Sequence, residues 1–100
     1  MSLRTKQSKF VKAVGLLITY AYDLGYELSF GDTYPGNFKH RKKSYHKLGL
    51  AIDLNLFQDG VYLTASSDHL PLGTYWESLG GTWGGRFPKP DGNHYSWGEE

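Results

Sequence analysis

Several features are scarce or absent in this chain of 100 residues: it has no cysteine, four prolines and no long apolar run. Without cysteine there are no disulfide bonds and no thiolate-ligated zinc, so any metal site must use His, Asp or Glu. The longest apolar stretch, residues 11–22, is too short for a membrane span and is interrupted by Lys12. It follows a basic N-terminus, but no small-residue cleavage site comes after it. We therefore expect neither a signal peptide nor insertion into a membrane.

Net charge is also small, at +1, but the charges are unevenly spread. Residues 1–50 carry nine Lys or Arg against three acidic residues, giving +6, whereas residues 51–100 carry two against seven, giving −5. The basic excess is densest over residues 39–47. Such a patch suits an anionic partner such as nucleic acid or an anionic cell wall, and it equally suits a solvated loop.

The length is that of one domain, so we treat residues 1–100 as a single domain in which residues 1–6 are frayed. Apolar residues recur at three- and four-residue steps over residues 7–24, which predicts an amphipathic helix. Ser8 is its expected N-cap, and Gly25 is its expected terminator.

The remaining elements are predicted from alternation and turn signals. Residues 26–30 alternate and predict a strand, and residues 48–64 predict a hairpin that turns at residues 58–60. A second helix is expected from Ser66 or Ser67 to about Leu79, followed by an irregular loop and a last strand over 94–97. This order predicts an α+β fold, with a small antiparallel sheet flanked by two helices.

Two histidines and one aspartate stand beside strand-like apolar segments. His46 and Asp53 are seven residues apart, and His94 comes near the C-terminus. Two imidazoles and one carboxylate suit a catalytic zinc, because they leave a fourth position for water. His46 and Asp53 would point to opposite faces of a straight strand, so the chain must bend between them, and Gly49 permits this. Asp91, three residues before His94, is then the natural general base. The set favours a small metallopeptidase.

Each histidine also has a structural alternative. His40 lies in the basic loop and is expected to be exposed, and His69 opens the second helix, where a surface or capping position is expected. For His46 and His94, spacing alone favours a structural histidine over a metal ligand. The metal site therefore does not follow from spacing by itself.

Two motifs go beyond spacing. The pattern Ser-x-His-x-x-Gly-x-Ala-x-Asp spans residues 44–53, and an acidic residue three places before a histidine is met by Asp91 and His94. With them the chain resembles the VanY-like zinc peptidases, which include D-alanyl-D-alanine carboxypeptidases and the L-alanyl-D-glutamate endopeptidases of phage endolysins. The resemblance covers roughly residues 10–97, and residues 53–87 are similar to phage and prophage members in particular.

The resemblance implies one zinc ion on His46, Asp53 and His94, with Asp91 as catalytic base. It implies hydrolysis of amide bonds in peptidoglycan stem peptides by a phage or prophage endolysin, held in the host cytoplasm until release to the cell wall. Two alternatives stay open: a D-alanyl-D-alanine carboxypeptidase, and a metal-stabilised wall-binding module without turnover. We expect a monomer and no nucleic-acid partner.

Substrate recognition departs from the family pattern at one position. Phage members usually carry an arginine suited to a substrate carboxylate where this chain has Pro35. Arg41 and Arg86 are candidate replacements, because guanidinium binds carboxylate in a bidentate manner.

Three other residues are candidates for the substrate cleft. Ser44 is either an orienting hydroxyl or a simple turn residue. Trp83 and Trp97 are candidate cleft walls, with core packing as the alternative for each.

Overall fold

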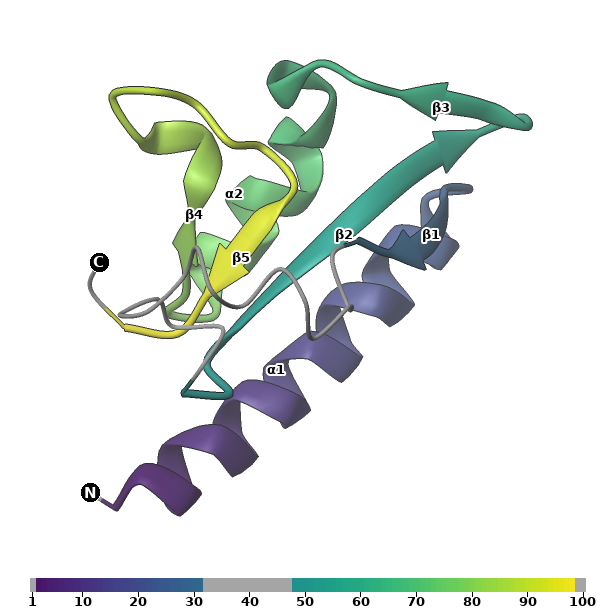
Figure 1. Ribbon diagram of the computed structural model, residues 1–100. Coiled ribbons are helices and arrows are strands. Elements are labelled where there is room, and N and C mark those ends of the chain that lie inside the picture. Colours follow the sequence, from purple (N-terminus) through teal and green to yellow (C-terminus); the bar gives the residue numbers. More distant parts are fainter. Residues whose placement is uncertain (1, 32–47, 99–100) are drawn as a thin grey trace.

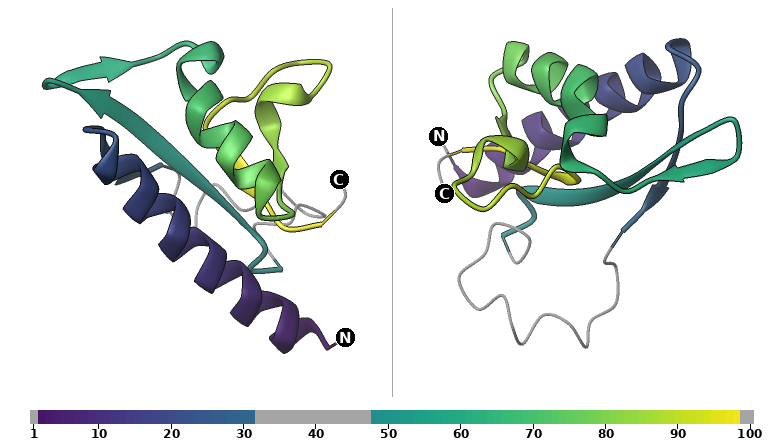
Figure 2. Two further views of the ribbon diagram at one scale, coloured as in Figure 1. Left: turned by 180° about the vertical axis from the view of Figure 1, so that it is seen from behind. Right: turned by 90° about the horizontal axis from the view of Figure 1, so that it is seen from above.

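The computed structural model describes residues 2–31 and 48–98. In this part of the chain both α-helices lie on one face of an antiparallel sheet, as the views in Figure 1 and Figure 2 show. This two-layer arrangement confirms the predicted α+β class. The elements are α1 (Leu3–Asp23), β1 (Glu27–Phe30), β2 (Ala51–Gln58), β3 (Val61–Leu63), η2 (Ser66–His69), α2 (Leu70–Ser78), β4 (Thr82–Trp83), η3 (Gly84–Arg86) and β5 (His94–Ser96), where η marks a 3-10 helix.

The sheet is organised around β2. β1 pairs with one edge of β2, whereas β3 and β5 both pair with the other edge. β3 lies opposite residues 56–58 of β2, and β5 lies opposite residues 51–53, so the two short strands follow one another along that edge. The chain leaves the sheet after β3, forms η2 and α2, returns as the edge strand β4, and passes through η3 to β5, which lies between β2 and β4. A gap between the ends of β3 and β5 results from this path.

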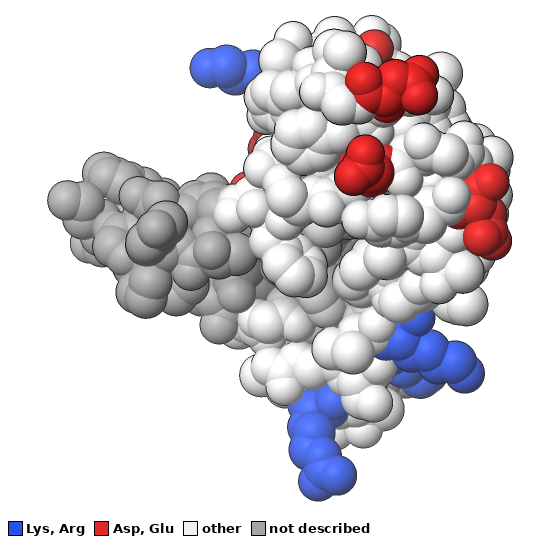
Figure 3. Space-filling model, turned by 90° about the vertical axis from the view of Figure 1, so that its right-hand side faces the viewer, with Lys and Arg blue, Asp and Glu red and all other residues white. Residues whose placement is uncertain are grey.

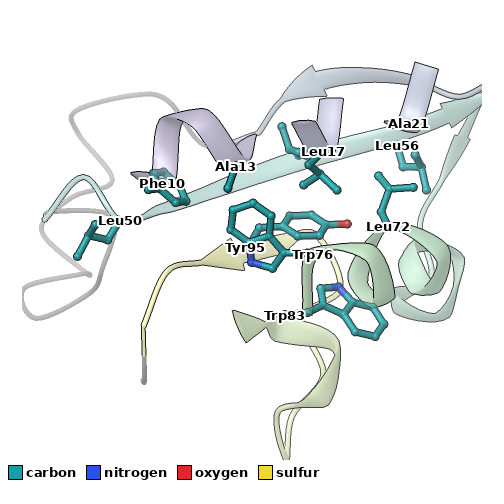
Figure 4. Packing of buried hydrophobic residues seen from close by; sticks show 11 residues of the cluster. Phe10, Ala13, Leu17, Ala21, Leu50, Leu56, Leu72, Trp76, Trp83 and Tyr95 are labelled. Atoms are coloured by element: carbon teal, nitrogen blue, oxygen red, sulfur yellow. The ribbon is translucent and has the colours of Figure 1, made fainter. Parts of the chain in front are cut away.

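The core lies between the helices and the sheet (Figure 4). On β2 the side chains of Leu54 and Leu56 are buried on the helix side, as the period of two for a strand requires. Trp76 of α2 is fully buried, and its Nε1 donates to the carbonyl oxygens of Thr82 at 3.1 Å and Ser96 at 2.9 Å. These two bonds hold α2 against β4 and β5. The buried apolar residues are Phe10, Ala13, Leu17, Ala21, Leu50, Leu54, Leu56, Leu72, Trp76, Trp83 and Tyr95.

The first helix is longer than the sequence indicated. Its N-cap is Ser2, whose Oγ accepts a hydrogen bond from the Thr5 backbone N at 3.1 Å, so Ser8 is not the cap. Residues 3–6, which we expected to be frayed, are helical. The other end agrees with the prediction: Gly25 has a φ of 90°, the left-handed conformation that ends a helix without strain.

The region of the second helix differs in detail from the prediction. Neither Ser66 nor Ser67 caps an α-helix, because residues 66–69 form η2 and α2 begins only at Leu70. Asp68 stabilises the start of η2, since its carboxylate accepts a hydrogen bond from the Ala65 backbone N at 3.1 Å. The loop expected after α2 contains β4 and η3, which are too short to carry a periodic signal.

The uneven charge of the sequence is also uneven in space. The basic residues of α1 all lie in its first half, and the first turn has no acidic residue. In Figure 3 the lysines and arginines near the bottom are separate from the acidic residues, which gather higher on this face. No helix in the described part of the chain combines the length and the apolar character that a membrane span needs.

Candidate active site

Asp53 and His94 face one another across the β2–β5 pair. The Asp53 carbonyl accepts a hydrogen bond from Gly31 N at 2.8 Å on the opposite, β1 side of the strand, so Asp53 and His94 form a non-hydrogen-bonded pair. Opposed side chains approach most closely in pairs of this type. Asp53 Oδ1 lies 3.5 Å from His94 Nδ1, and the two side chains are only 10% and 8% exposed. Strand pairing thus brings together two of the three predicted zinc ligands.

The separation of these two atoms suits two ligands of one zinc ion. Ligand atoms at about 2.0–2.1 Å from a tetrahedral ion lie about 3.4 Å from one another. The observed distance of 3.5 Å therefore needs little movement of either side chain to accept the ion. Carboxylate oxygen and imidazole nitrogen are both among the donors that zinc takes in proteins.

The third predicted ligand, His46, lies outside the described residues, as do Ser44, Arg41 and Pro35. Within residues 2–31 and 48–98, no three His, Asp or Glu side chains form a group that could hold a metal. The complete zinc site therefore stays a prediction that depends on His46.

The bend that a shared site requires is present at Gly49. This glycine has a φ of 70° in the turn that precedes β2. The side chain of Gln7 donates from Nε2 to the Leu48 carbonyl at 2.7 Å, which ties the turn to α1. The described chain thus turns at Gly49, directly before β2, which is the residue at which the prediction placed the bend.

Asp91, the predicted base, opens the short turn that leads into β5. Its backbone N donates to the Gly84 carbonyl at 2.9 Å, and its carbonyl accepts from His94 N at 3.1 Å. Gly84 packs closely under this turn, because a Cβ there would collide with the Asp91 carbonyl oxygen and lie 2.8 Å from His94 Cβ. The turn therefore fixes the Asp91 backbone beside His94, while the residue itself remains exposed.

A pocket of about 160 Å³ adjoins this turn. It lies where β3 ends and β5 begins, in the gap along the edge of β2. Ser66 closes one side, since its Oγ accepts a hydrogen bond from Gly92 N at 2.9 Å. The described residues of its wall are Tyr62, Thr64, Ala65, Ser66, His69, Pro90, Asp91, Gly92 and Asn93.

The guanidinium of Arg86 is already paired with a carboxylate of the protein. Its Nε and Nη2 donate to the two carboxylate oxygens of Glu77 at 3.1 and 3.2 Å, and its guanidinium carbon lies 5.0 Å from the centre of the Trp83 ring. The hydrogen bond to Glu77 raises the pKa of Arg86 above its ordinary value. Arg86 therefore connects η3 to α2, and its use for a substrate carboxylate stays a prediction.

The two candidate wall tryptophans take part in packing. Trp83 is 3% exposed, and its Nε1 donates to the Gly92 carbonyl at 2.7 Å, which anchors the turn that carries Asp91. Trp97 is half-buried, and its ring meets the ring of Trp76 edge to face at 5.6 Å. Trp83 also lines a second pocket, of about 280 Å³, next to Ser67, Leu70 and Arg86.

His69 is not where the sequence analysis expected it, because it is buried, at 3% exposure, and not at the surface. Its Nδ1 forms a hydrogen bond of 2.8 Å with the hydroxyl of Tyr95. A sequence signal for this was present: Leu72, Gly73 and Trp76, all buried, follow His69 at the three-, four- and seven-residue steps of a helix face. His69 continues the buried stripe of α2 into η2.

A comparison with known protein families agrees with the two sequence motifs. A family model described as D-alanyl-D-alanine carboxypeptidase matches residues 38–97, a segment that contains His46, Asp53, Asp91 and His94. No curated protein matches the chain. Because the match covers more than half of the sequence, the chain belongs to the D-alanyl-D-alanine carboxypeptidase family of VanY-like peptidases.

Proposed function

We propose that this peptidase-family protein is a zinc-dependent enzyme that hydrolyses amide bonds in peptidoglycan stem peptides, as a phage or prophage endolysin that cuts between L-alanine and D-glutamate. The observation that carries the proposal is the opposition of Asp53 and His94 at 3.5 Å, directly beside the turn of Asp91. The match to a peptidase family over residues 38–97 supports the peptidase part of the proposal. Storage in the host cytoplasm and action on the wall after release belong to the same proposal.

His46, Asp53 and His94 hold the metal in this proposal. When bound, zinc supplies a Lewis acid that polarises a carbonyl group and lowers the pKa of water to about 7. The carboxylate of Asp53 is suited to offsetting part of the charge of the metal ion, because the side chain is only 10% exposed and faces His94. The exposed Asp91 is suited to proton transfer, taking the proton of the attacking water and passing it to the leaving amine.

The family description favours a second candidate, the D-alanyl-D-alanine carboxypeptidase reaction. This reaction cuts next to a terminal carboxylate, which such an enzyme has to bind, usually with a cation. Among the described residues, the pocket beside Asp91 contains no lysine or arginine, and Arg86 is already paired with Glu77. Because phage members also bind a substrate carboxylate with an arginine, these observations do not separate the two reactions, and the bond that is cut has to be measured.

A digest of purified peptidoglycan, with and without a chelator, tests the proposal. Mass spectrometry of the released fragments identifies the bond. We expect a chelator-sensitive cut between L-alanine and D-glutamate. Release of terminal D-alanine alone would assign the carboxypeptidase reaction, and the absence of any cut by zinc-loaded protein would contradict a peptidoglycan peptidase.

A further inference from the structure

The face of β2 that carries the candidate metal ligand continues along the strand toward β3. Leu54 and Leu56 are buried on the helix side of β2. Because side chains alternate along a strand, Asp53, Asn55 and Phe57 point to the opposite face. Four residues of a strand span about 13 Å, so the backbone of Phe57 lies about that far from the backbone of Asp53. The proposed metal chemistry gives the side chains beyond Asp53 no role.

A second aromatic ring joins this row from β3, at the end of β2 that lies away from β5 (Figure 1). Tyr62 is the register partner of Phe57, and their ring centroids are 5.2 Å apart with an interplanar angle of 37°. A cross-strand aromatic pair stabilises a hairpin by itself. The pair also presents aromatic surface to solvent, because Phe57 is only half-buried and Tyr62 is 52% exposed.

Neutral polar groups border the two rings. The Tyr62 hydroxyl donates to Asn55 Oδ1 at 3.5 Å, and Asn55 Nδ2 donates to Ser29 Oγ of β1 at 3.2 Å. These bonds use one of the two Nδ2 hydrogens and one of the two Oδ1 lone pairs, so the amide can still donate once and accept once. We call Ser29, Asn55, Phe57 and Tyr62 the aromatic patch.

The composition of the aromatic patch indicates the chemistry of a ligand. A saccharide ring has C–H groups on its faces, which pack on aromatic rings, and hydroxyl and amide groups at its rim, which exchange hydrogen bonds. An aliphatic chain would cover the Asn55 amide without offering it a partner, which is costly. An ionised group would meet no opposite charge within the patch. An uncharged sugar fits both parts of the surface.

Tyr62 also connects the aromatic patch to the candidate active site. It lines the same pocket of about 160 Å³ as Asp91, so one surface runs from the proposed base to the two rings. A ligand held at the metal centre can therefore extend along β2 and reach the patch.

The distance along β2 agrees with the position of the sugar in one of the two candidate reactions. In peptidoglycan the stem peptide begins at L-alanine, which a lactyl group joins to an amino sugar. For a cut after L-alanine, one residue and the lactyl group separate the bond from the sugar ring, about 7 Å when extended. For a cut before the terminal D-alanine, four residues and the lactyl group intervene, about 17 Å or more. A ring that begins about 7 Å from the bond reaches the aromatic patch directly.

We propose that the aromatic patch is a saccharide subsite, which binds the amino sugar that carries the stem peptide. The ring of the sugar packs on Tyr62 and Phe57, and its rim exchanges hydrogen bonds with Asn55. The proposal rests on the proposed function, because the sugar is then part of the substrate. It implies that the enzyme prefers stem peptides that are still attached to the glycan.

Binding of two compounds to the zinc-loaded protein tests the subsite. N-acetylmuramyl-L-alanine and D-lactyl-L-alanine differ only in the sugar, and neither contains an L-alanyl-D-glutamate or D-alanyl-D-alanine bond. We expect the saccharide compound to bind about tenfold more tightly, the effect of about one aromatic contact, and to shift the ring resonances of Phe57 and Tyr62 in NMR titrations. Equal affinities, or no measurable binding of the saccharide compound, would overturn the subsite.

Variants on β3 separate the ring from its surroundings. Tyr62→Ala removes the ring and is expected to reduce the preference to about twofold or less, whereas Tyr62→Phe keeps the ring and should keep the preference within about threefold. Val61→Ala is the matched control, because Val61 is 60% exposed and precedes Tyr62 on the same strand, so that it points to the other face. An unchanged preference in a folded Tyr62→Ala protein would overturn the proposal. If this variant does not fold, the wild-type comparison still decides.

The subsite and the proposed function fail in different ways. Cleavage of a muramyl stem peptide and of the same peptide with an N-acetyl group in place of the sugar, with equal kcat/KM, would support the peptidase and overturn the subsite. Tighter binding of the saccharide compound, without cleavage of any peptidoglycan, would support the subsite and contradict the peptidase.

Discussion

Asp53 and His94 are 41 residues apart in sequence, yet Asp53 Oδ1 and His94 Nδ1 lie 3.5 Å apart in the structure. Their opposition follows from the register of β2 with β5. Because the Asp53 carbonyl accepts a hydrogen bond from Gly31 N on the β1 side, Asp53 and His94 form a non-hydrogen-bonded pair, in which opposed side chains come closest. The candidate metal centre is thus built on two paired strands of the sheet, and its remaining ligand is predicted to come from the segment before Gly49.

Removal of either opposed side chain should weaken metal binding. Asp53→Ala and His94→Ala are each expected to lower zinc affinity by more than about 100-fold, because two protein ligands hold the ion less well than three. Competition with a coloured chelator measures the affinity. Asn55→Ala, two residues along the same face of β2, is the matched control and should keep the affinity within about threefold. Equal losses in Asn55→Ala and Asp53→Ala would contradict the assignment.

Asp91→Asn should separate catalysis from metal binding. Two of the bonds that hold the Asp91 turn are made by its backbone N and O, and the substitution leaves these two bonds in place. We expect unchanged zinc content and an unchanged Tm, with kcat reduced by about 10²–10⁴-fold, the usual contribution of a general base. Turnover by Asp91→Asn at the wild-type rate would mean that another group takes the proton.

Gly84→Ala should disturb the site through packing. A Cβ at this position collides with the Asp91 carbonyl oxygen, so the turn before β5 must move. We expect a loss of about 1–3 kcal/mol in the free energy of unfolding, together with weaker zinc binding. Gly15→Ala is the matched control, because a Cβ there meets nothing within 4 Å in the middle of α1, and it should stabilise the protein by about 0.5–1 kcal/mol. Denaturant titration of both variants gives the comparison, and equal stability of the two would contradict the close packing at Gly84.

Stability should depend on pH through His69. Its pKa is about 4 in the folded chain against 6.5 when exposed, so the unfolded chain binds the proton first as the pH falls. The contribution of neutral His69 to the free energy of unfolding is complete above pH 6.5. It is lost as the pH falls toward 4, by up to about 3 kcal/mol.

Denaturant titrations between pH 7 and 4, with chelator present, measure this dependence. His69→Gln is expected to be less stable at pH 7 and to lose less stability over the same range. If the free energy of unfolding falls with pH by the same amount in both proteins, His69 is not the group that titrates.

Much of the fold could be predicted from local patterns. The helix ending at Gly25, the strands on either side of the turn at residues 58–60, and the last strand are all encoded by period and turn residues close together in sequence. The start of α1 was missed because the serine cap at residue 2 precedes a first turn whose one apolar residue, Leu3, is exposed and does not extend the buried stripe.

The candidate site was also predicted only in part, and the reason differs from that for the fold. The two motifs identify the ligand types, but the opposition of Asp53 and His94 is a matter of strand register, which no local pattern contains. His69 was assigned to the surface because a histidine at a helix start is usually a polar terminal residue. Its burial depends on the Tyr95 hydroxyl, which is contributed by a strand 26 residues later.

X-ray absorption of the zinc-loaded protein tests the central claim most directly. We predict one zinc per chain, with two imidazole ligands at about 2.0–2.1 Å, one carboxylate and one water oxygen. The number of imidazoles should fall to one in His46→Ala and in His94→Ala. A protein that binds no stoichiometric zinc, or a zinc shell without imidazole, would contradict the metal centre and with it the proposed hydrolytic function.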